Sequence, residues 1–127
     1  MIKNGRYGLY HGKEFKISED ADDNMVILTE DISLIDNTFE DLYDSGVYTK
    51  QIMPKDLDKL YSIVTVGYIE GIKVYVRGER EEHYIVGTGN ESDARMLGLE
   101  RSDKYGYEGA VSKNRISIKE EKTSLME

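Results

Sequence analysis

Apolar and polar residues alternate over short runs that are separated by turn-forming residues. In residues 5–17, apolar side chains recur two positions apart on both sides of the dipeptide His11-Gly12. This alternation around a glycine-containing turn predicts a β-hairpin. The polar residues 19–24 predict a loop, and the β-branched run in residues 25–29 predicts a third strand that is buried.

The link to the next strand has a less regular pattern. Phe39, Leu42 and Tyr43 are spaced as on one side of a helix, which predicts one or two helical turns. Residues 46–52 then return to strand character. Pro54 predicts the start of a short helix, because proline lacks the amide hydrogen that the first helical position leaves unpaired. Three apolar residues would form the buried side of that helix: Leu57, Leu60 and Tyr61.

The second half of the chain repeats this order of elements. Alternation predicts strands in residues 63–69 and 72–77, joined by a turn at Glu70-Gly71, and a further strand in residues 83–88.

Two more elements are predicted before the C-terminus. Ser92 is a suitable N-cap and Gly98 a suitable closing residue, which predicts a short helix between them. Residues 105–111 predict the last strand, and the mostly polar residues 120–127 predict a frayed tail.

The two halves match at a constant offset of 59 residues, without a gap. Glycine, apolar and threonine positions recur together: Gly8 and Gly67, Gly12 and Gly71, Ile17 and Val76, Val26 and Ile85, Ile27 and Val86, Thr29 and Thr88, Ile52 and Val111, Leu57 and Ile116. This self-similarity predicts one unit duplicated, with a first β repeat in residues 1–60 and a second in residues 61–119. Gly12 and Gly71 should then occupy equivalent hairpin turns.

The pattern predicts a mainly β protein with short helices, and α+β is the fallback class. Each repeat is expected to be a small bent sheet or a partly closed barrel. Halves of about 60 residues are marginal on their own. The repeats are therefore expected to pack as one compact body about a pseudo-twofold axis, with residues 7–57 superposing on residues 66–116.

The composition argues against several kinds of chemistry. The chain has no cysteine, and its two histidines, His11 and His83, fall at unrelated positions of the two halves. Disulfides, thiolate metal sites and histidine-dependent catalysis are therefore not expected. The sequence predicts no catalytic residue, no metal and no cofactor, and a protein that is not an enzyme.

Neither a signal peptide nor a membrane-spanning helix is expected. The N-terminal residues have no apolar run behind their charges, and no window approaches about 18 continuous apolar residues. We therefore expect a cytoplasmic protein without a membrane partner, and a monomer is favoured.

The sequence Asp20-x-Asp22-x-Asn24 begins like a calcium-binding loop. However, Met25 stands where that loop needs glycine, and Asp31 stands where it needs a bidentate glutamate. A calcium site is therefore not predicted.

Acidic residues are concentrated in the first half. The net charge of −8 argues against binding nucleic acid through its phosphates, so a charged partner should be basic. Residues 1–60 hold 7 basic and 13 acidic groups, whereas residues 61–127 hold 10 and 12. No lysine or arginine lies between Lys16 and Lys50, an interval that contains ten carboxylates.

Two interpretations of this acidic stretch are open. It could be a solvated surface that keeps the protein soluble and needs no partner. It could instead be a docking face, since a dense patch of one sign steers association with a basic protein. In the second case, Tyr43 would be an apolar anchor with a polar tip among carboxylates. The predicted partner-binding residues are Asp20, Asp22, Asp23, Glu40, Asp41, Tyr43 and Asp44.

Three segments carry a resemblance to a known class. They are Gly5-x-Tyr7-x-x-Tyr10-x-Gly12-x-Glu14, residues 46–52 and residues 105–113. With these segments the chain resembles small acidic immunity proteins of Gram-positive bacteria, which neutralise secreted polymorphic toxins. The resemblance implies a non-enzymatic cytoplasmic inhibitor that occludes the active site of a cognate basic toxin domain, commonly a nuclease. It implies no catalytic residue.

Three hypotheses of different classes follow. The leading one is an immunity protein that binds a basic toxin through the acidic face of the first repeat. The alternative is a small ligand-binding or regulatory β module that uses the cleft between the repeats. The third is an enzyme with a site assembled across the repeats.

Overall fold

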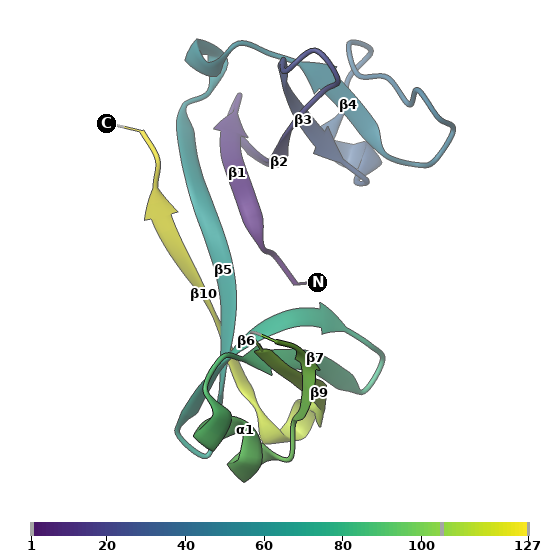
Figure 1. Cartoon of the computed structure of the whole chain (residues 1–127). Coiled ribbons are helices and arrows are strands. Elements are labelled where there is room, and N and C mark those ends of the chain that lie inside the picture. The colour runs from purple at the N-terminus through teal and green to yellow at the C-terminus, as the bar shows by residue number, and fades with distance from the viewer. Residues whose placement is uncertain (1, 105, 127) are drawn as a thin grey trace. The chain divides into compact units, whose positions relative to one another are not determined.

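The chain is mainly β, as its alternating pattern predicts. The computed structural model describes residues 2–104 and 106–126, which form ten strands, one α-helix and three 3-10 helices. The strands are β1 (Gly5–Tyr10), β2 (Lys13–Glu19), β3 (Met25–Thr29), β4 (Tyr48–Gln51), β5 (Lys59–Ile69), β6 (Ile72–Glu79), β7 (His83–Thr88), β8 (Glu100–Asp103), β9 (Gly106–Ser112) and β10 (Ser117–Ser124) (Figure 1). The helices are α1 (Glu91–Leu97) and the 3-10 turns η1 (Ile32–Leu34), η2 (Pro54–Asp56) and η3 (Lys113–Arg115).

The chain divides into two compact units, and each unit takes residues from both ends of the chain. The first unit is Gly5–Ile63 with Lys122–Glu127, and the second is Met1–Asn4 with Val64–Glu121. The boundary therefore falls within β5, between residues 63 and 64. The N-terminal segment belongs to the second unit and the C-terminal segment to the first, whereas a division at residue 60 would assign each to the other unit.

The strands of the first unit follow the order β4-β3-β2-β1-β5, with antiparallel neighbours. The strands of the second unit follow the order β5-β6-β7-β9-β8, and β10 also pairs with β5. Neither order returns to its first strand, so the strands form an open sheet and not a partly closed barrel.

The predicted equivalence of Gly12 and Gly71 is confirmed. His11 and Gly12 form the two-residue turn between β1 and β2, with φ of 52° and 78°. Glu70 and Gly71 form the turn between β5 and β6, with φ of 52° and 83°. Positive φ at both central residues is the geometry that matches the twist of a tight hairpin.

The strand pairing also follows the offset seen in the sequence. Gly8 pairs with Phe15 in the first unit, and Gly67 pairs with Val74 in the second, so both members of the pair differ by 59. The pairing of β3 with β4 and of β7 with β9 keeps the same relation. The correspondence between the two registers is interrupted between Val76 and Gly78, where β6 has a β-bulge opposite β7. Duplication of one ancestral unit stays a hypothesis, as does the superposition of residues 7–57 on 66–116.

Each unit has its own apolar core, built from the inward positions of its strands and, in the first unit, also from Ile52 and Leu57 between β4 and β5. The cluster of the first unit is Phe15, Ile17, Ile27, Ile52 and Leu57, and that of the second is Ile69, Val74, Val76, Val86 and Val111. Because side chains of a strand alternate between its two faces, the neighbours of these residues point to the opposite face.

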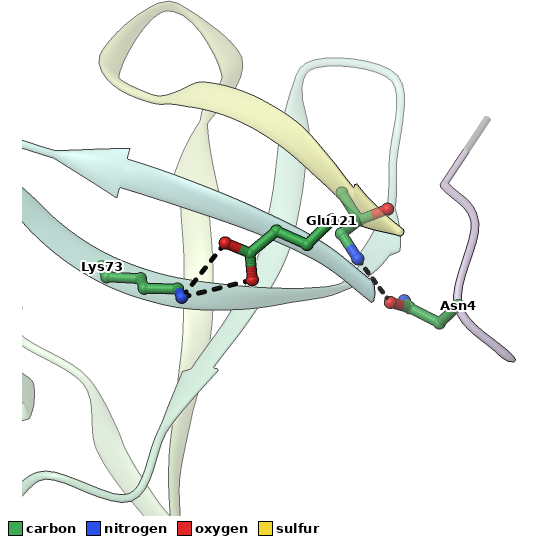
Figure 2. A network of polar contacts seen from close by, with 4 residues as sticks. Asn4, Lys73 and Glu121 are labelled. Carbon is green, nitrogen blue, oxygen red and sulfur yellow. Dashed lines mark hydrogen bonds and ion pairs between the residues drawn. The ribbon is translucent and has the colours of Figure 1, made fainter. Parts of the chain in front are cut away.

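Asn4, which precedes β1, is hydrogen-bonded to strands of the second unit. The side-chain amide of Asn4 donates to the Val76 carbonyl at 2.9 Å, and its oxygen accepts the Thr65 N–H at 2.8 Å. In the same unit, Lys73 on β6 and Glu121 on β10 form an ion pair of 3.2 Å (Figure 2). This pair raises the pKa of Lys73 through its hydrogen bond to Glu121. Both side chains are about 40% exposed, so the pair adds little to stability.

The predicted helical turns around Phe39 are wrong. The structure has the 3-10 turn η1 (Ile32–Leu34) earlier in this link, and residues 35–47 form turns and bends. Phe39 stacks on the core residue Phe15 with ring centroids 5.5 Å apart, whereas Leu42 and Tyr43 are 66% and 87% exposed. These apolar residues therefore do not share one buried side.

The other expected helices are correct in place but not in every detail. Pro54 does begin η2, yet Leu60 and Tyr61 lie in β5 and not on a helix. Gly98 closes α1 with φ of 72°, while the N-cap is Asn90 and not Ser92. The frayed tail is wrong for residues 120–124, which belong to β10. In the part of the chain that the structure describes, no helix has the length and apolar character needed to cross a bilayer.

Candidate protein-binding site

An open groove lies in the first unit, on the face of β2, β3 and β4 that points away from its core. Its volume is about 580 Å³. It is lined by Ser18, Glu19, Asp20, Val26, Leu28, Thr38, Glu40, Leu42, Tyr43, Thr49, Lys50 and Gln51. The groove thus has apolar side chains from β3 and carboxylates from the surrounding segments.

The structure brings three of the predicted site residues together at this groove. They are Asp20, Glu40 and Tyr43. The other four predicted residues, Asp22, Asp23, Asp41 and Asp44, lie outside its lining.

Glu40 is placed at the groove by backbone pairing. Its N–H donates to the Thr49 carbonyl at 2.9 Å, and its carbonyl accepts the Thr49 N–H at 2.8 Å. This isolated antiparallel bridge sets Glu40 opposite Thr49 of β4. The Glu40 carboxylate has no hydrogen-bond or ion-pair partner among the residues that the structure describes.

Asp41 fixes the loop that presents Tyr43. Its carboxylate accepts the backbone N–H groups of Ser45 at 2.9 Å and of Gly46 at 2.8 Å. Asp44 has φ of 51° and Gly46 has φ of 83°, so the loop turns sharply at both positions. Its tip therefore leaves Tyr43 in solvent.

Turn formation explains part of the density of aspartates in residues 17–49. Asp20, Asp31 and Asp36 each accept a backbone N–H two residues on, an arrangement typical of aspartate in turns. Asp23, with φ of 62°, adopts the left-handed conformation that aspartate tolerates better than most residues. The predicted docking residues Asp20, Asp23, Asp41 and Asp44 thus also shape the loops.

Hydrogen bonding lowers the pKa of four aspartates of these loops: Asp20, Asp31, Asp36 and Asp41. The pKa of Asp41 is lowered, chiefly because its carboxylate accepts the N–H groups of Ser45 and Gly46. The pKa of Asp20 is lowered mainly by the N–H of Asn24, and those of Asp31 and Asp36 mainly by hydroxyl groups. Their donors are neutral groups, so the loops keep their negative charge.

The division into units sharpens the charge asymmetry. The first unit holds seven basic and fourteen acidic residues, a net charge of −7. The second holds ten and eleven, a net charge of −1. Among the groove residues, Glu19 is paired with Arg6 at 3.1 Å, and the Lys50 ammonium lies 5.0 Å from the centroid of the Tyr10 ring.

The sequence did not identify the apolar floor of the groove. The run in residues 25–29 predicted a buried strand, yet only Ile27 of this run is fully buried, and Val26 and Leu28 are half-buried at the groove. The sequence does contain a signal for this floor, since the apolar residues Val26 and Leu28 alternate with Ile27 in a strand next to the acidic segment. Leu42 was predicted to lie on one side of a helix, whereas it lines the groove from a loop.

Acid should selectively weaken the loop that Asp41 organises. The folded state lowers this pKa, so the stabilisation is fully present above the unfolded value of about 3.9 and is lost as the pH falls through the folded value. Asp41→Asn should therefore unfold at lower urea than wild type at pH 6, and the difference should shrink toward pH 3. Asp22→Asn is the control, because the Asp22 carboxylate accepts none of the hydrogen bonds of these loops. A difference that stays constant with pH would contradict this role.

No group of three or more histidine, cysteine or carboxylate residues suited to a metal occurs within residues 2–104 and 106–126. His11 lies in the first hairpin turn and stacks on Tyr10, and His83 begins β7 at the surface. Neither histidine lines the groove.

The fold and the groove define a mainly β protein whose candidate site is an open acidic surface. The chain belongs to the family described as "Uncharacterised conserved protein UCP033725", which it matches over residues 2–127. No curated protein and no solved structure matches the chain.

Proposed function

We propose that this protein is a non-enzymatic inhibitor that binds a basic protein through the groove of the first unit. The observation that supports this function most is the apolar floor of Val26 and Leu28, left open beneath an acidic surface. A strand that is apolar on both faces is typical of one covered on both faces. A partner protein would supply the cover that the first unit lacks.

Charge restricts the kind of partner. The first unit carries −7 and has no basic residue between Lys16 and Lys50. A surface of one sign accelerates association with a partner of opposite sign and repels partners of like sign. The proposed partner is therefore a basic protein and not a nucleic acid.

The resemblance to immunity proteins suggests which basic protein this is. A toxin domain that acts on nucleic acid needs a positively charged groove for phosphates. The carboxylates of the first unit would occupy that groove, and Tyr43 would anchor the contact. In this proposal inhibition is steric and electrostatic, so the inhibitor needs no catalytic group.

The function is tested by capturing the partner and then measuring its binding to purified variants. The captured protein should be basic, and the purified inhibitor should abolish its toxic activity. Asp22→Lys with Glu40→Lys should slow association by about tenfold or more at low salt and should flatten the dependence on salt. Both residues are exposed, and neither carboxylate accepts a hydrogen bond that shapes the loops described above.

Glu81→Lys with Glu82→Lys is the matched control, because it reverses two exposed charges in the second unit. This variant should associate at nearly the wild-type rate. The proposal is wrong if the control loses binding while the variant Asp22→Lys with Glu40→Lys binds as wild type, or if the captured partner is acidic.

A further inference from the structure

The second unit has a counterpart of the groove, and it is much smaller. Its volume is about 280 Å³, and it lies on β7, β8 and β9. Its lining includes Ile85, Glu108 and Ala110. These residues stand 59 positions after Val26, Thr49 and Gln51 of the larger groove, and the strand registers of the two units correspond there.

An arginine of the second unit covers this face. A Cβ atom added at Gly87 would lie 2.7 Å from Cζ and 2.8 Å from Nε of Arg77, so the guanidinium rests directly on the backbone at Gly87. Its Nη1 pairs with Glu108 Oε2 at 3.2 Å. The bulge after Val76 lies at this arginine, and bulges commonly redirect a side chain. The second unit therefore places an arginine–carboxylate pair on its outer face at Gly87, although Arg77 is not among the residues that line the smaller groove.

In the first unit the groove residue Glu19 pairs with Arg6 at 3.1 Å, and Arg6 is not among the residues that line the groove. By the 59-residue offset, the positions that correspond to Arg77, Gly87 and Glu108 are Ser18, Leu28 and Thr49. Because of the bulge, Gly78 pairs with Ile85 as Ser18 pairs with Val26, so Arg77 is the extra residue of β6. Besides Glu19 and Asp20, the groove has the carboxylate of Glu40, which the bridge holds opposite Thr49. Opposite residues in an antiparallel pair have Cβ atoms about 4.5–5.5 Å apart, so a glutamate reaches the space above threonine.

We propose that the groove of the first unit receives an arginine side chain of the basic partner, as the second unit receives its own Arg77. The guanidinium pairs with Glu40, the aliphatic stem packs on Leu28, and the Tyr43 ring offers a face for stacking. A planar guanidinium can pair with a carboxylate through two hydrogen bonds and can stack on an aromatic ring, which a lysine ammonium does less well. This inference rests on the proposed function and names the group of the partner that is recognised.

The test uses the full chain, labelled with ¹⁵N, and Nα-acetyl-arginine amide as the probe. Titration should shift the backbone amide signals of Glu40, Tyr43 and Thr49 to saturation. Nα-acetyl-lysine amide should bind at least about threefold more weakly. Glu40→Gln should weaken binding of the arginine probe by about fivefold or more, because it removes the charge from the acceptor. Glu81→Gln is the control and should change nothing.

A second variant places an arginine of the chain itself in the groove. Ser18→Arg with Leu28→Gly and Thr49→Glu copies the arrangement of the second unit and should abolish the saturable shifts. If this triple variant does not fold, Glu40→Gln still decides the matter. Equal binding of the arginine and lysine probes, or shifts that survive Glu40→Gln, would overturn the proposal.

The two proposals can fail separately. If the basic partner binds but the probe leaves the groove signals unchanged, the arginine site is wrong and the proposed function stands. If the probe binds in the groove but the captured partner is not inhibited, the proposed function is wrong and the arginine site stands.

Discussion

Replacing Tyr43 with alanine should shorten the lifetime of the complex with the basic partner by about thirtyfold. Loss of an aromatic anchor from an interface costs on the order of 2 kcal/mol or more, and each 1.4 kcal/mol is a factor of ten. The side chain is 87% exposed in the free protein and lines the groove, so contact area that it gains comes from the partner. The dissociation rate constant should rise, while the association rate constant should change little, since the substitution leaves the charge unaltered.

The stability of the free protein should hardly respond to this change. Substitution of an exposed residue typically moves the free energy of unfolding by less than about 0.5 kcal/mol. Tyr75→Ala is the control, because Tyr75 is 46% exposed and belongs to the second unit. The control should leave dissociation unchanged. Equal effects of the two substitutions on dissociation would exclude Tyr43 as the anchor.

Gly67→Ala should lower the free energy of unfolding by about 1–3 kcal/mol, the range typical of overpacking. A Cβ atom at this position would lie 2.3 Å from Cδ1 and 2.7 Å from Cγ1 of Ile116, so the isoleucine must move. The cost should appear in urea unfolding followed at pH 7. Gly78→Ala is the control, because its added Cβ would meet Ile85 at an ordinary 3.6 Å.

A second substitution identifies the cause. Ile116→Val removes the methyl group nearest to the new Cβ, so it should partly rescue Gly67→Ala. The double variant should lose less stability than the two single changes together, by about 0.5 kcal/mol or more, because the residues are in contact. Simple additivity would show that the cost arises elsewhere. Gly8 is also closely packed in the first unit, where an added Cβ would lie 2.8 Å from the Lys59 carbonyl oxygen and 3.1 Å from Leu57 Cδ2.

Local pattern was sufficient wherever one short segment decides its own structure. The hairpin turns at Gly12 and Gly71 were predicted because a two-residue turn needs positive φ, which glycine adopts freely. The strands that hold Ile17 and Val76 were predicted because apolar and polar residues alternate along them, and both residues lie in the apolar cores. The excess of acidic groups in the first half is a property of composition and needed no fold.

Other features depend on residues that are distant in the sequence. Tail residues 120–124 form part of a strand because β5 offers them a partner, and Leu125 N–H donates to the Leu60 carbonyl at 2.9 Å. Residues 3 and 4 belong to the second unit because their backbone and side chains bond to Thr65. Such contacts join positions about 60 residues apart, and no local pattern encodes them.

The candidate site was predictable in charge but not in shape. The sequence placed Asp20, Glu40 and Tyr43 in one acidic stretch, and folding brings them to one groove. It did not show that Val26 and Leu28 form the floor of the groove. A short apolar run has the same pattern whether one face or both faces of the strand are covered by other segments. It also did not show that Asp41 holds the loop by hydrogen bonds. The sequence alone determined most of the strands, the tight turns and the sign of the charge, since these follow from local backbone preference and composition. It did not predict β8 or β10. Tertiary structure decided these strands and which faces are covered, since both depend on which distant segments meet.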